Sequence, residues 1–129
     1  MTVALLVALA GSSAGCGRVD DGRAAGAVTE RFLAAVADGD GALACRQLTV
    51  GALEALEHEE GDRCSQSARD LEVTPSRVVR TQVYSTNAKV DLADGESAFL
   101  ELTSRGWRIS AAGCRPEPDD QPYTCEVEA

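Results

Sequence analysis

The apolar residues in the first half of the chain recur with the period of an α-helix. Residues 24–37 are rich in Ala, which favours helix. A single apolar stripe runs along this segment at positions i, i+4, i+7 and i+8, made by Val28, Phe32, Ala35 and Val36. Alternating Asp and Gly at 38–41 then favour a turn. We therefore predict a helix over 24–37 that buries one face.

Three shorter helical segments are expected next, each preceded by a residue that caps helices. Asp40 precedes 41–48, Thr49 precedes 50–60, and Asp62 precedes 64–71. Asp and Thr side chains accept hydrogen bonds from the free N–H groups of a first helical turn. The residues expected to face inward are Leu43, Ala44, Leu48, Val50, Leu53 and Leu56.

After Pro75 the apolar pattern changes from a helical period to a period of two, which is typical of strands. Strands are predicted at 77–84, 88–92, 97–103 and 107–113, with a fifth at 123–127. Asp94-Gly95 is a typical tight-hairpin dipeptide. The expected inward face carries Val79, Thr81, Val83, Ala88, Val90, Leu92, Ala98, Leu100, Leu102, Trp107, Ile109 and Ala111.

Helices followed by hairpin-connected strands predict an α+β fold. One apolar face of the antiparallel sheet needs a cover, and the N-terminal helices supply it. We expect N-terminal helices packed on a curved antiparallel sheet of four to five strands. Within that sheet, Trp107 is expected to anchor the core because aromatic rings bury a large area. Phe99 shares its face with Glu101 and is expected on the outer side, as a candidate partner contact.

The N-terminus carries a targeting pattern. An apolar run, 3–10, leads to Ser13-Ala14-Gly15-Cys16, which resembles a bacterial lipobox. This predicts a cleaved signal peptide over 1–15, a lipidated Cys16 with a flexible tether over 16–26, and a single domain over 27–129. The position three before Cys16 is Ser13, and Met1–Gly15 holds no basic residue. An ordinary secretory signal, an unstructured cytosolic N-terminus and a different translation start therefore stay open.

Charge and cysteine content narrow the function classes. The formal net charge is −9, so nucleic acid is not an expected partner, and anionic headgroups repel the domain as a whole. Attachment of the domain to a membrane would then depend on acyl chains. Of the five cysteines, lipidation of Cys16 leaves four, which allow three pairings. We favour the neighbouring pairs, Cys45 with Cys64 and Cys114 with Cys125. Zinc is disfavoured because no Cys-x-x-Cys occurs and His58 is the only His.

Several short motifs resemble those of small actinobacterial lipoproteins with a nuclear transport factor 2-like domain, the class that includes SnoaL and ketosteroid isomerase-like proteins. The motifs are Phe32-Leu33-Ala34-Ala35-Val36 with Gly39-Asp40, Ala44-Cys45, and Gly106-Trp107-Arg108-Ile109 with Ala111-Ala112-Gly113-Cys114. The resemblance implies a cone of helices on a bent sheet around a central pocket. It implies little about function, since that superfamily holds isomerases, cyclases, dehydratases and non-catalytic binding domains.

Candidate catalytic residues are few and poorly placed by the sequence pattern. His58 lies in an acidic helix end, where a solvated surface role is expected. A comparison with ketosteroid isomerase points to Asp91, Glu101 and Tyr84. Asp91 and Glu101 alternate with apolar neighbours, and Tyr84 shares its face with Gln82 and Arg80, so none is expected to point into a pocket. We therefore expect no catalytic set and no cofactor. Trp107, Phe99 and Tyr84 remain as candidate contacts for a pocket or a partner.

Together these patterns favour a lipid-anchored, non-enzymatic binding or accessory domain on the outer face of the cytoplasmic membrane. Its expected partners are the membrane, through the lipid, and either a membrane protein or a small apolar ligand. The alternative is a small isomerase- or cyclase-type enzyme that uses a pocket in the cone.

Overall fold

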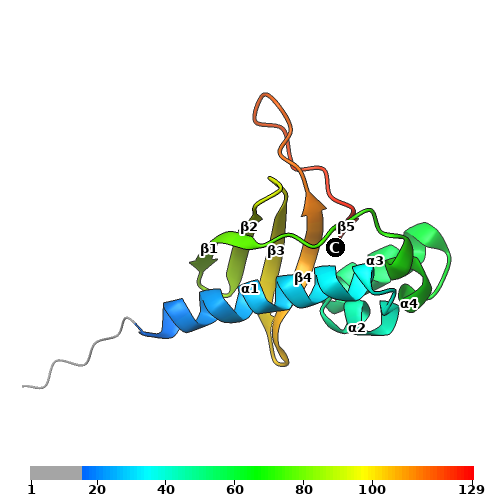
Figure 1. Ribbon diagram of the computed structural model, residues 1–129, viewed down its shortest axis with the longest axis horizontal. Helices are drawn as coiled ribbons and strands as arrows, with labels where there is room; N and C mark the ends of the chain where they lie inside the picture. The colour runs from blue at the N-terminus through cyan, green and yellow to red at the C-terminus, as the bar shows by residue number, and fades with distance from the viewer. Residues whose placement is uncertain (1–15) are drawn as a thin grey trace, which may run out of the picture.

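The protein folds as helices packed on one antiparallel sheet, and a computed structural model describes residues 16–129 (Figure 1). The helical part comprises α1 (Cys16–Ala37), α2 (Gly41–Arg46), α3 (Val50–Glu60), α4 (Cys64–Ser67) and the 3₁₀ turn η1 (Ala68–Asp70). The strands are β1 (Val78–Tyr84), β2 (Asn87–Leu92), β3 (Ser97–Thr103), β4 (Gly106–Cys114) and β5 (Val127–Glu128). The signal peptide predicted for 1–15 lies outside the described residues.

The sheet is an open antiparallel meander with the strand order β1-β2-β3-β4-β5. Helix α1 crosses one face of this sheet (Figure 1). Helices α2, α3 and α4 lie beyond the C-terminal end of α1, beside β4 and β5 (Figure 1). The predicted α+β class, with N-terminal helices on an antiparallel sheet, is confirmed. The sheet does not close on itself, and β1 and β5 form its two edges.

One buried cluster joins the two layers. From α1 it takes the predicted stripe, in which Phe32 is fully buried, and from the sheet it takes Val90, Leu100 and Ile109, each at most 1% exposed. Trp107 lies in the same cluster and is 4% exposed, so the prediction that it anchors the core is confirmed. The residues identified by the helical period of α1 and those identified by the alternation along the strands therefore belong to the same core.

Residues 17–26, expected as a flexible tether, instead form the first half of helix α1. The sequence analysis treated their glycines as signs of flexibility, but Gly22 and Gly26 face β1. A Cβ at Gly22 would lie 3.6 Å from Cγ2 of Thr81, and one at Gly26 would lie 3.6 Å from Cγ2 of Val78. A methyl group at either position would make only ordinary van der Waals contact with the strand, and the neighbouring Ala25 is fully buried. Packing against the sheet thus stabilises a helix over 17–26 that the local sequence does not predict.

Two of the three predicted caps are present. The Asp40 carboxylate accepts from the N–H of Leu43 at 3.0 Å, and the Thr49 hydroxyl accepts from the N–H of Ala52 at 3.1 Å. Asp62 does not cap the next helix; the Cys64 N–H instead donates to Oε1 of Glu57 at 3.0 Å. That prediction was wrong because a glutamate seven residues earlier in the sequence reaches the same N–H group.

The inward face of α3 also differs from the prediction. Val50 is 58% exposed, whereas Ala52 and Leu56 are buried. The helix turns its Ala52–Leu56 side to the core, so Val50 falls on the solvent side of its first turn.

Register shifts in the β1–β2 and β3–β4 pairings change which strand residues face inward. In β1 the shift lies between Val78 and Arg80, and it leaves Val79 51% exposed while Val78 packs against the core. Between β3 and β4, Leu100 pairs with Ile109 but Phe99 pairs with Ala111, so β4 carries one extra residue there. A bulge of this kind moves the following side chains to the opposite face.

The bulge in β4 corrects the expected inward face at its end. Ala111, predicted to lie beside Ile109 in the core, pairs with Phe99 on the outer face, and Ala112 takes its place in the buried cluster. Leu102, also predicted inward, is 43% exposed near the β3–β4 turn. The fifth strand is shorter and later than predicted: β5 pairs with β4 only through Val127 and Glu128, and a separate isolated bridge joins Arg115 and Thr124.

The four cysteines 45, 64, 114 and 125 lie as two neighbouring pairs. The Sγ–Sγ distance is 2.04 Å between Cys45 and Cys64 and 2.16 Å between Cys114 and Cys125. These are the pairs that sequence proximity predicted. The first joins α2 to the start of α4, and the second ties the C-terminal segment to the end of β4.

Peptide mapping of the unreduced protein should show Cys45 linked to Cys64 and Cys114 linked to Cys125. Each link closes a short loop and is expected to stabilise the fold by about 3 kcal/mol in the loop-entropy model. Reduction should accordingly lower the denaturation midpoint. A crossed linkage, such as Cys45 to Cys114, would overturn the two local clamps.

Candidate functional site

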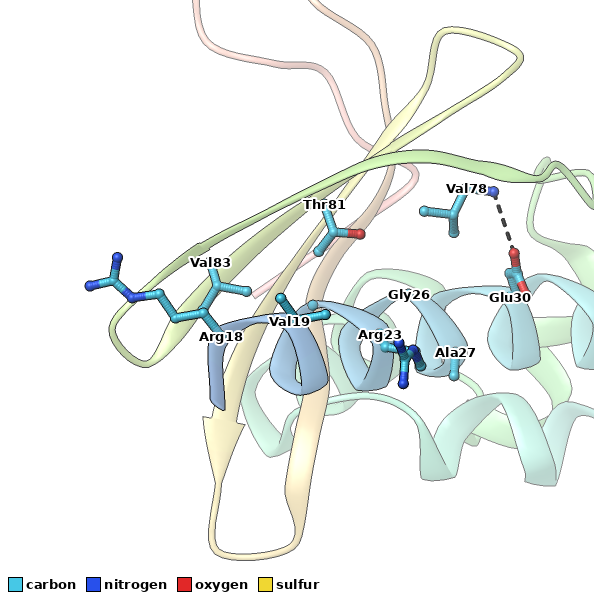
Figure 2. A pocket seen from close by; sticks show the side chains of 10 residues that line it. Arg18, Val19, Arg23, Gly26, Ala27, Glu30, Val78, Thr81 and Val83 are labelled. Carbon is cyan, nitrogen blue, oxygen red and sulfur yellow. Dashed lines mark hydrogen bonds between the residues drawn. The ribbon is translucent and has the colours of Figure 1, made fainter. Parts of the chain in front are cut away.

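A groove runs between helix α1 and the edge strand β1 (Figure 2). Its volume is about 650 Å³, within the range of about 300–1,000 Å³ typical of small-molecule sites. The lining combines small and apolar side chains with three charged ones. The lining residues are Arg18, Val19, Gly22, Arg23, Gly26, Ala27, Glu30, Val78, Thr81 and Val83.

The floor of the groove follows from the approach of α1 to β1. Gly22 and Gly26 provide no side chain there, so Val78, Thr81 and Val83 of β1 are left partly uncovered. In Figure 2, Val19 points from the helix toward β1 and closes the floor at its N-terminal side. The result is an apolar channel with one polar hydroxyl, that of Thr81.

The charged side chains separate along the groove. Arg18 lies at the end nearest the start of α1, and Glu30 lies toward the opposite end (Figure 2). Glu30 accepts a hydrogen bond from the N–H of Val78 at 3.4 Å, which engages its carboxylate with the strand. Arg23 is 3.7 Å from Asp20, but both side chains are more than 70% exposed, so this pair holds the guanidinium only loosely. Arg23 can therefore exchange Asp20 for an anionic ligand at little cost.

A second, smaller groove of about 450 Å³ lies on the outer face of the sheet. Phe99 and Tyr123 meet there edge to face, with ring centroids 5.3 Å apart, and the Lys89 ammonium lies 5.4 Å from the Tyr123 ring centroid. Phe99 is on the outer side, as predicted, but the C-terminal segment partly covers it. Glu101 also lines this groove.

The chain matches no known protein-family model, no curated protein and no solved structure. The site is therefore described from its own geometry. Within residues 16–129, no helix is both long and apolar enough to cross a bilayer, and no group of three metal-ligating side chains comes together.

The three contact residues predicted from the sequence are not brought together. Trp107 is buried, and its Nε1–H donates to Oδ1 of Asp21 at 3.4 Å. Phe99 lies on the outer face, and Tyr84 is 58% exposed at the end of β1. None of the three lines the α1–β1 groove.

The acids considered as bases also lie away from that groove. Asp91 is held by Lys89 at 3.1 Å and accepts a hydrogen bond from the Ser97 hydroxyl at 2.8 Å. Glu101 is exposed, and so is His58 in the last turn of α3. Desolvation raises the pKa of Asp91, but the Ser97 hydrogen bond and Lys89 outweigh it, so the pKa lies below its ordinary value. The Asp91 carboxylate is therefore the ion-pair partner of Lys89.

The pKa of Lys89 moves in the complementary direction. Hydrogen bonding to Tyr123 contributes most, burial opposes it, and Asp91 adds to it, so the pKa of the ammonium is raised. Lys89 therefore connects the C-terminal segment to the sheet through a charge that is stable at neutral pH. This part of the outer face is organised for stability.

The Asp91→Asn substitution should destabilise the protein at neutral pH and matter progressively less in acid. Because folding lowers the pKa of Asp91, its contribution is present above the unfolded-state pKa and is lost as the pH falls through the folded-state pKa. Urea midpoints of wild type and variant, measured from about pH 7 down to about pH 2, should converge. In a Lys89→Met background the same substitution should cost less. A constant gap across the range would contradict the ion-pair assignment.

The sequence analysis missed the residues of the α1–β1 groove because it assigned 16–26 to a tether. Val19, Gly22 and Gly26 stand at i, i+3 and i+7, so they share one face of a helix, but this face is not the one that carries Val28 and Phe32. Small residues at those positions look like a flexible linker until a partner strand is known.

Proposed function

We propose that this protein is a lipid-anchored, extracytoplasmic, non-enzymatic domain that binds a small apolar ligand or a membrane partner. The observation that carries the proposal is Ser13-Ala14-Gly15-Cys16, which supplies a lipidation site immediately before the domain. The two neighbouring cysteine pairs support an oxidising, extracytoplasmic setting, because disulfides persist there.

The geometry of the groove supports binding over catalysis. Its floor is apolar, and Glu30 is the acid among the described residues that line it. A general base must come within hydrogen-bond reach of the proton that it abstracts, and Asp91 and Glu101 do not line this channel. An isomerase- or cyclase-type enzyme is the less favoured function. Kinship with nuclear transport factor 2-like domains likewise remains a proposal, which rests on short motifs and on the α+β arrangement.

The test is the chemical state of Cys16. We expect the intact mass of the mature protein to start at Cys16 and to include a diacylglyceryl group. A mature protein that carries no lipid and begins elsewhere would remove the anchored part of the proposal.

A further inference from the structure

The start of helix α1 places the α1–β1 groove next to the proposed anchor. The helix begins at Cys16, and Arg18 and Val19 already line the groove. At 1.5 Å per residue, Val19 is about 5 Å along the helix axis from Cys16. The headgroup layer on each side of a bilayer is itself about 5–8 Å thick. A helix, and not a flexible tether, connects Cys16 to the groove. The groove therefore opens at the lipid surface when Cys16 is lipidated.

The chemistry of the groove suits an amphiphile with a negative head. Val19, Val78 and Val83 offer an apolar track, and burying aliphatic carbon against them is favourable. Arg18 lies at the end of the groove nearest Cys16 and Arg23 lies farther along it beside Ala27 (Figure 2), and a guanidinium binds phosphate oxygens with two parallel hydrogen bonds. These two positive side chains stand out on a chain with a net charge of −9.

We propose that the α1–β1 groove binds one acyl chain of an anionic membrane phospholipid, with Arg18 holding the phosphate at the end nearest Cys16 and Arg23 adding positive charge farther along the channel. This inference rests on the proposed function, because the lipid anchor delivers the groove to the bilayer. It names the ligand class that the anchored domain takes: a phospholipid of the leaflet in which it sits.

The direct test is photo-crosslinking in vesicles. Wild-type protein is reconstituted in phosphatidylcholine vesicles that contain phosphatidylglycerol with a photoactivatable group on one acyl chain. We expect crosslinked peptides from 18–30 and 78–83. We also expect much weaker labelling when the same acyl chain is carried by phosphatidylcholine, because only phosphatidylglycerol has a net negative charge for Arg18 and Arg23.

Matched variants locate the site. Ala27 is exposed and lines the groove, so Ala27→Trp fills the channel and should lower crosslinking there about tenfold, equivalent to about 1.4 kcal/mol. Ala24 is exposed on the same helix but does not line the groove, so Ala24→Trp should leave labelling unchanged. Arg18→Glu with Arg23→Glu should abolish the preference for phosphatidylglycerol, whereas Arg31→Glu, outside the groove, should not.

A second measurement separates this inference from the proposed anchor. Dihexanoyl phosphatidylglycerol, which is soluble as a monomer, is titrated into the purified protein and followed by native mass spectrometry. Saturable binding that Ala27→Trp weakens supports the groove even if Cys16 proves unlipidated, in which case only the anchor falls. An acylated Cys16 with no binding overturns the groove and leaves the anchor in place.

The remaining outcomes also decide the matter. Equal binding of phosphatidylcholine, or binding of glycerol 3-phosphate as strong as that of the lipid, overturns the assignment of an anionic phospholipid. Dimers that depend on Ala27 and exclude lipid would assign the groove to a second copy of the chain instead.

Discussion

Replacement of Trp107 by alanine is expected to lower the free energy of unfolding by about 3–5 kcal/mol, the usual cost of deleting a large buried aromatic side chain. Trp107 is 4% exposed and lies in the cluster beneath α1. The substitution also removes the Nε1–H donor to Asp21, which links β4 to the first half of α1. A domain of this size has about 5–15 kcal/mol to lose, so the variant should melt at a much lower temperature.

Circular dichroism must report this loss, because Trp107 is the only tryptophan and its fluorescence disappears with it. Phe99→Ala is the matched control, since Phe99 is the aromatic residue on the opposite face of the same hairpin. That change gives up the edge-to-face contact with Tyr123, worth about 0.5–1.5 kcal/mol, and only part of a buried area. Equal losses of unfolding free energy in the two variants would mean that the inward face of the sheet is assigned to the wrong side.

The Cys16→Ser substitution is expected to move the protein from the membrane fraction to the soluble fraction. Stable anchoring needs two acyl chains or an equivalent second signal, and a diacylglyceryl group on Cys16 supplies both chains. The remaining domain carries the whole net charge of −9, so an anionic surface repels it overall. A single lipid held in the α1–β1 groove would exchange and could not retain the protein through washing.

The control for this experiment is another cysteine-to-serine change. Replacing both Cys45 and Cys64 removes their disulfide and leaves Cys16 intact, so that variant should be less stable but still membrane-bound. Fractionation with carbonate washing and intact mass spectrometry measure both properties. The anchor is excluded if Cys16→Ser remains in the membrane fraction and the wild-type mass shows no lipid.

The sequence by itself determined the order and type of most elements. The stripe of α1 around Phe32 and the alternation of Val90 and Leu92 are local patterns whose period matches one backbone geometry. The caps by Asp40 and Thr49 were equally readable, since a cap joins residues only three positions apart. Cysteine proximity also identified both neighbouring pairs, because each brackets a short segment.

Only the tertiary structure decided the features that depend on contacts distant in sequence. The bulge in β4 exchanges Ala111 for Ala112 in the core, and register against β3 sets it, not any local pattern. The shift beside Val79 has the same origin in the pairing of β1 with β2.

The α1–β1 groove shows the same limit most clearly. Gly22 and Gly26 signal flexibility when the chain is considered alone, because glycine costs a helix conformational entropy. Against β1 the same absence of side chains leaves the groove open, and burial of the neighbouring Ala25 helps offset that cost. Local sequence thus determined where the core elements lie. The partner strand, distant in the chain, decided that 17–26 is helical and that a groove opens beside Cys16.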